Sequence, residues 1–137
     1  MSDVIDFSSG HFVHLGLGAT TVPLPQHTGD VSWYAEYGQQ HAADGFEGRL
    51  VSMHTFSESW DVWEMHPNGS ELVLCVAGEV ALTREAIDGT VSTVTICAGE
   101  AVVNDPGVWH TADLVDGAPN PTVVFITAGV GTEMRDR

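Results

Sequence analysis

The sequence predicts an all-β fold, and three features of residues 49–128 lead to that prediction. Short apolar runs follow one another at regular spacing, and Gly, Pro, Asn and Asp separate them. The segments between the turn residues of this region are too short for a substantial helix. Short strands at even spacing, with turn residues between them, are typical of β-sandwiches and small β-barrels. We therefore expect about eight strands in one sandwich or barrel.

The N-terminal part of the chain has a different composition. Residues 1–30 are rich in Gly, Pro and Thr, which indicates an extended arm with loops. Residues 31–45 have room for one short helix that ends near Gly45, and its aromatic side chains would pack on the β-domain or on a partner subunit. The expected division is therefore an N-terminal arm with a short helix over residues 1–48 and a single β-barrel domain over residues 49–137.

The turns between the strands define where each strand begins and ends. Asn68-Gly69 and Asp88-Gly89 are strong hairpin signals, so we expect a hairpin at each of these positions. Other turns that contain Gly or Pro separate the remaining strands. The expected strands are residues 49–56, 60–66, 71–77, 79–86, 90–96, 101–104, 109–115 and 122–128.

Size and charge limit the function. The chain has 137 residues, which suffices for one domain with a hydrophobic core. Its net charge is −15, and binding to nucleic acid or to an anionic membrane requires Lys and Arg, so we expect neither partner. No apolar run approaches the about 20 residues of a membrane span. The N-terminus MSDVIDFSSG lacks the basic and apolar segments of a signal peptide, which favours a cytoplasmic location.

The two cysteines are expected to be structural. Cys75 and Cys97 both lie in apolar runs that resemble strands, and neither belongs to a C-x-x-C pattern. In a cytoplasmic chain this context predicts buried, reduced thiols.

Three residues of types that bind metals occur where strands prefer apolar side chains. Glu64, His66 and Glu71 lie within eight residues of one another. Alternate residues of a strand face the same side, so Glu64 and His66 share a face, and the turn after His66 brings Glu71 near it. His110 lies in a later strand, on a face with small and apolar residues. Burying an unpaired carboxylate is costly, so these side chains either face water or bind something.

The spacing of these residues resembles the two motifs of the cupin superfamily over roughly residues 49–128. The first motif of that family is H-x-H, three or four residues, Glu, six residues and Gly. The matching run in this sequence is Glu64-x-His66, four residues, Glu71, six residues and Gly78. The second motif is Gly, five residues, P-x-G, two residues, His, three residues and Asn, and the match here is Gly99, five residues, DPG, two residues and His110.

The sequence departs from the family pattern at four positions. These are Glu58 in place of the Gly that opens the first motif, Glu64 in place of its first His, Asp105 in place of the Pro of P-x-G, and Leu114 in place of the final Asn. Three of the departures concern turns and packing. The change at Glu64 concerns the metal, because it replaces an imidazole by a carboxylate.

The resemblance implies a double-stranded β-helix, which is a jelly-roll-like barrel, with a divalent metal in its interior. His66, Glu71 and His110 match ligand positions, and Glu64 occupies the fourth ligand position or, if it does not bind the metal, serves as a general base. Two imidazoles with one or two carboxylates suit Fe, Mn, Zn or Ni, so the identity of the metal stays open. Cupins commonly pair through edge strands and N-terminal arms, which implies a homodimer.

These residues also have ordinary structural alternatives. Glu64 would hydrogen-bond at the barrel mouth without a metal, Glu71 would pair with Arg84 or Arg49, and the two histidines would be hydrogen-bonded core residues. Outside the motifs, His54 is expected in the core or at the surface, with a place in the wall of the pocket as the alternative. Core or interface positions are expected for the tryptophans beside the motifs, again with the pocket wall as the alternative; they are Trp60, Trp63 and Trp109. Surface positions are expected for His11, His14, His27 and His41.

Three kinds of function agree with these features. The first is a small metalloenzyme that acts on a small polar metabolite, either as an isomerase or lyase or, with iron, as a dioxygenase. The second is a small-molecule-binding domain without turnover. The third is a structural or interaction protein in which any metal only stabilises the fold. We favour the first.

Overall fold

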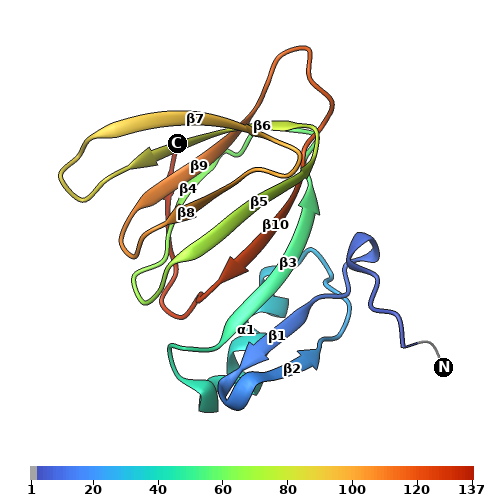
Figure 1. Ribbon diagram of the computed structural model, residues 1–137. Helices are drawn as coiled ribbons and strands as arrows, with labels where there is room; N and C mark the ends of the chain where they lie inside the picture. Colours follow the sequence, from blue (N-terminus) through green and yellow to red (C-terminus); the bar gives the residue numbers. More distant parts are fainter. Residues whose placement is uncertain (1–2) are drawn as a thin grey trace.

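The computed structural model describes residues 3–137, in which two β-sheets face each other across the core (Figure 1). The strands of the described residues are β1 (Val13–Gly16), β2 (Thr20–Pro23), β3 (Arg49–Thr55), β4 (Val62–Met65), β5 (Glu71–Ala77), β6 (Glu79–Glu85), β7 (Val91–Cys97), β8 (Ala101–Asn104), β9 (Trp109–Leu114), β10 (Thr122–Thr127) and β11 (Glu133–Asp136). The helices are α1 (Val31–Gln40) and three 3-10 turns, η1 (Phe7–Ser9), η2 (Leu17–Ala19) and η3 (Ala42–Asp44).

The strand order confirms the predicted all-β, jelly-roll-like fold class. One sheet has the order β2-β1-β3-β10-β5-β8 and the other has the order β11-β4-β9-β6-β7. The neighbouring strands pair antiparallel. The chain crosses repeatedly from one sheet to the other between β3 and β10, as it does in a jelly roll. A residue on the inner face of either sheet therefore points into a shared interior.

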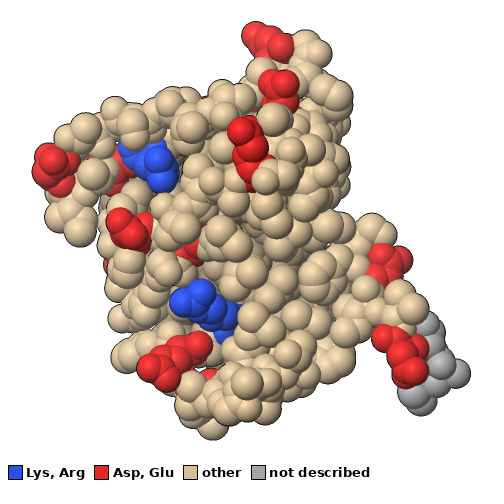
Figure 2. Space-filling model, in the orientation of Figure 1, with Lys and Arg blue, Asp and Glu red and all other residues tan. Residues whose placement is uncertain are grey.

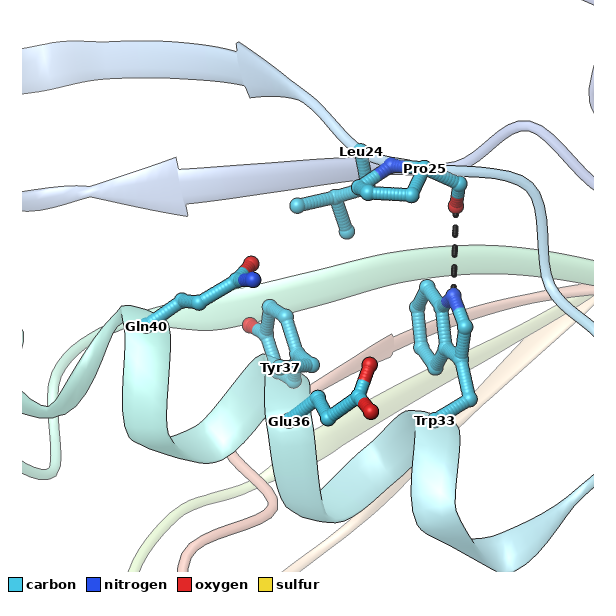
Figure 3. A pocket seen from close by; sticks show the side chains of 6 residues that line it. All are labelled: Leu24, Pro25, Trp33, Glu36, Tyr37 and Gln40. Atoms are coloured by element: carbon cyan, nitrogen blue, oxygen red, sulfur yellow. Dashed lines mark hydrogen bonds between the residues drawn. The ribbon is translucent and has the colours of Figure 1, made fainter.

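The predicted short helix is α1, and it lies with β1 and β2 at one end of the molecule (Figure 1). Asp30 caps the helix, because its side chain accepts a hydrogen bond from the Ser32 N–H at 3.1 Å. Trp33 is buried, and its indole N–H donates to the Pro25 carbonyl oxygen at 3.2 Å (Figure 3). The pocket beside it has a volume of about 30 Å³, which is too small for a metabolite.

Three strands were not predicted from the sequence. β1 and β2 form within the segment that was expected to be an extended arm, and β1 extends the first sheet by pairing with β3. β11 extends the second sheet at the C-terminal end of the chain. The four residues of β2 and the four of β11 are all exposed, so neither strand has the alternation of apolar and polar residues that identifies a strand in a sequence.

One of the two predicted hairpins is correct. β6 and β7 pair on either side of Asp88-Gly89, where the Thr90 N–H donates to the Asp88 carboxylate at 2.9 Å. The hairpin at Asn68-Gly69 is wrong, because β4 lies in one sheet and β5 in the other. The Asn68 side chain donates instead to the Val130 carbonyl oxygen at 2.9 Å. This turn therefore carries the chain across the core.

The hydrophobic core lies between the two sheets. Its buried members are Val73, Cys75, Val80, Leu82, Ile96, Ala112, Val123 and Phe125. Cys75 is buried as a free thiol, as predicted, but the expectation of burial is wrong for Cys97, which is exposed at the end of the edge strand β7. No helix of the described residues is both long enough and apolar enough to cross a bilayer.

The aromatic group around His54 is expected to make the stability of the protein depend on pH. The His54 ring lies 5.4 Å from the ring of Phe12, 5.6 Å from His27 and 6.1 Å from Phe125, between centroids. Burial and the nearby His27 lower the pKa of His54 to about 4. An unfolded histidine titrates near pH 6.5, so the unfolded chain binds more protons between pH 6.5 and 4. We expect His54 to remove up to about 3 kcal/mol of stability as the pH falls through that range.

Urea denaturation at pH 7 and at pH 4.5 tests this expectation. A His54→Phe variant keeps an aromatic ring in the group but cannot take up a proton, so it should lose less stability over the same range. An NMR titration of the His54 ring supplies an independent midpoint. Equal losses in the variant and the original chain would assign the pH dependence to other groups.

Candidate metal centre

The four side chains predicted to bind a metal lie together between the sheets. Glu64 belongs to β4, His66 directly follows that strand, Glu71 opens β5, and His110 lies in β9. Glu64 and His110 are directly opposite each other in the β4–β9 ladder, so their side chains share a face. His66, Glu71 and His110 are 6%, 3% and 3% exposed, whereas the Glu64 side chain is 29% exposed. Glu64 therefore lies on the side of the group that is open to solvent.

The distances within the group are those of residues that can share one cation. The Oε2 atom of Glu71 lies 3.1 Å from His66 Nε2, and its Oε1 atom lies 3.5 Å from His110 Nε2. The Oε2 atom of Glu64 lies 3.9 Å from His66 Nε2. Adjacent ligand atoms at about 2.1 Å from an octahedral metal are about 3 Å apart. Small inward movements would therefore bring all four side chains to bonding distance.

Two buried nitrogens of the group lack hydrogen bonds. The Nε2 atoms of His66 and His110 are buried, and neither makes a hydrogen bond to any described residue, although Glu71 lies close to both. Leaving a buried polar atom unpaired costs about 1–3 kcal/mol, so such atoms are uncommon in native structures. A cation placed between these nitrogens and the carboxylates would satisfy both of them. The residues present thus fit a divalent metal.

Glu71 is fixed in place and held ionised. Thr127 donates to its Oε2 atom at 2.7 Å, and the Asn104 amide donates to its Oε1 atom at 3.3 Å. Burial alone would raise the pKa of Glu71, but its contacts with His66, His110 and Thr127 outweigh burial and lower the pKa. No described arginine forms an ion pair with Glu71, so the alternative of a pair with Arg84 or Arg49 is not observed.

The ring of His66 is oriented by Thr132. The Thr132 hydroxyl donates to the Gly129 carbonyl oxygen at 2.7 Å, so it accepts from the His66 Nδ1–H at 2.8 Å. This hydrogen bond directs Nε2 of His66 toward the carboxylates. Metal-binding histidines commonly donate their second ring N–H in this way, which fixes the tautomer and the ring orientation.

Replacing Thr132 by valine should weaken metal binding without removing a ligand. The variant loses the acceptor that orients His66, and the loss of such an outer partner typically costs about 10- to 100-fold in metal affinity. Competition with a chromophoric chelator measures the change. Thr93→Val is a matched control, because Thr93 shares a hydroxyl hydrogen bond of 2.8 Å with Thr83 on β6 and β7, outside the group. Equal affinities in both variants would contradict the role of Thr132.

The charges of the site favour a bound cation. Burial lowers the pKa of His110 to about 4, so this imidazole is neutral near pH 7. Burial acts in the same direction on His66, but the carboxylates of Glu71 and Glu64 outweigh it and raise the pKa of His66. Burial and the charge of Glu71 raise the pKa of Glu64. The two carboxylates thus attract positive charge to the point where the two imidazoles meet.

A second group of residues of metal-binding types lies outside this interior. It consists of His14 in β1, His41 at the end of α1, and Asp44 in η3. His14 is 2% exposed, so its predicted surface position is wrong. Its Nδ1 atom lies 2.6 Å from the Tyr37 hydroxyl, and its Nε2 atom lies 2.6 Å from the Asp44 carboxylate. These hydrogen bonds already satisfy the His14 ring and tie α1 and η3 to β1.

The tryptophans beside the motifs have two different environments. Trp60 lies on the inner side, with its ring 6.2 Å from that of His110 and 6.1 Å from that of Phe125. Trp63 and Trp109 instead hold the Arg135 guanidinium, which lies 5.0 Å and 4.6 Å from their ring centroids. Only Trp60 of these three therefore contributes to the wall of the candidate site.

No protein-family model matches the chain, and no curated protein matches it. Solved structures do match. An oxalate decarboxylase structure is 14% identical, covers 72% of this chain and superposes with a TM-score of 0.52. Oxalate decarboxylase from Bacillus subtilis, described with Mn(II) centres, has the same identity and coverage and a TM-score of 0.51. Peruvianin-I from Thevetia peruviana latex, named as a cysteine peptidase, is 18% identical over 65% of this chain, with a TM-score of 0.47.

This likeness concerns the fold. The chain spans about a quarter of the two oxalate decarboxylase chains, at 26% of their length, and 54% of peruvianin-I. The architecture shared with oxalate decarboxylase is that of the cupins, so the predicted cupin fold is confirmed.

Proposed function

We propose that this chain binds one divalent metal through Glu64, His66, Glu71 and His110 and uses it to act on a small polar metabolite. The observation that supports this most directly is the pair of buried Nε2 atoms that lack hydrogen bonds and lie between two carboxylates. Two imidazoles and two carboxylates suit Fe, Mn, Zn or Ni. The Mn(II) centres named for the Bacillus subtilis oxalate decarboxylase agree with metal chemistry on this fold.

Each residue has a role in the proposed reaction. A bound metal supplies Lewis acidity to an oxygen of the substrate. Glu71 and the two imidazoles hold the site in shape from the buried side. Glu64 lies on the open side, where its carboxylate is placed to take a proton from a substrate at the metal. The arrangement suits isomerisation or elimination by proton transfer and, with iron, oxygen-dependent cleavage.

Metal analysis is the first test. The protein is purified without a nickel column, and its metal content is measured before and after incubation with Fe(II), Mn(II), Zn(II) and Ni(II). We expect about one metal per chain. A His41→Ala variant serves as the control and should keep this metal, because His41 belongs to the second group of residues. A chain without metal under all four conditions, or a metal lost with His41, would contradict the proposal. Oxygen uptake with Fe(II) then tests the oxygenase branch.

Replacing Glu64 by glutamine separates its two roles. As a general base, Glu64 should be needed for turnover but not for metal retention, because glutamine keeps an oxygen donor. We expect the variant to hold its metal and to lose about 10²- to 10⁴-fold in turnover of a substrate found with the metal-loaded protein. If the Glu64→Gln variant loses its metal, the main role of Glu64 is that of a metal ligand. Thermal stabilisation by small molecules without turnover would instead favour a binding protein.

The same chain is proposed to form a homodimer through β2. This strand lies at the edge of its sheet, and all four of its residues are exposed. An edge strand presents unpaired backbone N–H and C=O groups, which a second chain can satisfy. Light scattering gives the oligomeric state, and a Thr21→Pro change in β2 should shift it toward monomer.

A further inference from the structure

A cavity of about 220 Å³ lies beside the candidate metal centre, between the edges of the two sheets. Its lining comes from the ends of β6, β7 and β8 and the turns next to them. The lining residues are Arg84, Ala86, Thr90, Ser92, Val103, Asn104, Asp105 and Val108. The sites of drug-sized ligands typically measure about 300–1,000 Å³, so this cavity suits a smaller molecule.

The register of the two sheets places the cavity next to the metal-binding group. Arg84 lies directly opposite His110 in the β6–β9 ladder, and Asn104 lies directly opposite Glu71 in the β5–β8 ladder. Residues that face each other in a ladder point to the same side of the sheet. Each wall of the cavity thus has a polar side chain next to a residue of the candidate metal centre.

Arg84 supplies positive charge in a chain with few cations. Four basic residues stand against nineteen acidic ones, and Figure 2 shows correspondingly few blue patches on the face that it draws. Arg135 pairs with Glu85, and Arg137 pairs with Asp113. Arg84 forms no ion pair with the described residues, and one of its N–H groups donates to the Val103 carbonyl oxygen at 3.2 Å. Its other donors remain available for a ligand, and a guanidinium binds carboxylate particularly well.

Asn104 lines the same cavity and has a buried acceptor without a donor. The side chain is 4% exposed, and its amide nitrogen donates to Glu71. Its Oδ1 atom makes no hydrogen bond to the described residues. A buried carbonyl oxygen without a donor is costly, and the hydroxyl group of a ligand that reaches it would supply the missing donor. The carboxylate of Asp105, which also lines the cavity, accepts from a hydroxyl group but repels a second anionic group.

We propose that this cavity binds a small hydroxycarboxylate, with the carboxylate on Arg84 and the hydroxyl group on Asn104. The proposal rests on the proposed metal function in one respect. If the metal acts on the molecule bound in this cavity, the cavity identifies the chemical class of the substrate. Binding through Arg84 and Asn104 needs no metal ligand.

Calorimetry with three matched probes tests the proposal. The probes are racemic lactate, lactamide, which lacks the charge, and propionate, which lacks the hydroxyl group. They are titrated into the zinc-loaded and the zinc-free protein. We expect lactate to bind at least about tenfold more tightly than either analogue in both forms. Arg84→Gln should weaken lactate binding about 10- to 100-fold, and Arg84→Lys, which keeps the charge but not the planar guanidinium, should have an intermediate effect.

Arg49→Gln is the matched control. It removes the same charge from an exposed position in β3, so it reports the effect of net charge alone and should leave lactate binding within about twofold. Equal binding of lactate and lactamide, equal losses in both glutamine variants, or no lactate binding at all would overturn the proposal. Zinc content is measured separately, so a failure of the metal function is distinguished from a failure of this inference.

Discussion

Replacing His110 by alanine is expected to lower the affinity of the protein for divalent metal by more than about 100-fold. Loss of an outer hydrogen-bond partner alone typically costs about 10- to 100-fold, and His110 is proposed to bind the metal directly. The variant removes one of the two imidazole nitrogens proposed to bind the metal and leaves the Glu71 carboxylate without one of its two imidazole neighbours. Chelator competition with Zn(II) and Mn(II) measures the affinity, and circular dichroism measures the fold.

Two further variants make this result specific. His66→Ala should reproduce the loss, because the two histidines contribute equivalent nitrogens to one point. His41→Ala should keep the affinity, although it removes a histidine from the second group of residues of metal-binding types. If His110→Ala remains folded and binds metal as tightly as the original chain, His110 is a core histidine, as the structural alternative holds.

The sequence predicts the interior strands well because turn residues separate short apolar runs. β5 is the run ELVLCVA between the Asn68-Gly69 turn and Gly78, and the structure adds that Glu71, Val73 and Cys75 are its buried residues. β2 and β11 escape prediction because their stability comes from backbone pairing, and no apolar face marks them. Turn chemistry has a similar limit. Asn68-Gly69 is a turn, but a turn does not determine which strand becomes the partner of the next one.

The same reasoning explains what could be predicted of the candidate site. Glu64, His66, Glu71 and His110 stand out because charged or imidazole side chains occur among strands that are otherwise apolar. Their supporting residues, Thr127, Thr132 and Asn104, are of ordinary types and lie 33 to 66 positions away from the side chains that they contact. Only the register of the sheets, such as the pairing of Glu71 with Asn104, brings them to the site. The same holds for Arg84, which becomes relevant once it is known to face His110.

Replacing Gly78 by alanine is expected to destabilise the protein by about 3 kcal/mol or more, for two separate reasons. Gly78 joins β5 to β6 with φ +71°, a left-handed conformation that costs other residues about 1–2 kcal/mol. A Cβ atom there would also lie 2.5 Å from the Asn120 carbonyl oxygen and 2.7 Å from that of Pro119. Both contacts are with backbone, so the loop before β10 has to move, and overpacking of this kind typically adds about 1–3 kcal/mol.

Gly89→Ala separates the two reasons, because Gly89 has a similar φ of +86° but no atom lies within 4 Å of the place that an alanine Cβ would take there. This control should therefore lose only the conformational contribution of about 1–2 kcal/mol. Urea denaturation of both variants gives the difference, which we expect to be about 2 kcal/mol. A difference of this size means that the close approach of the 119–120 backbone, in addition to the left-handed turn, requires glycine at the end of the first motif. Equal losses would mean that the loop accommodates a methyl group and that φ alone determines the residue.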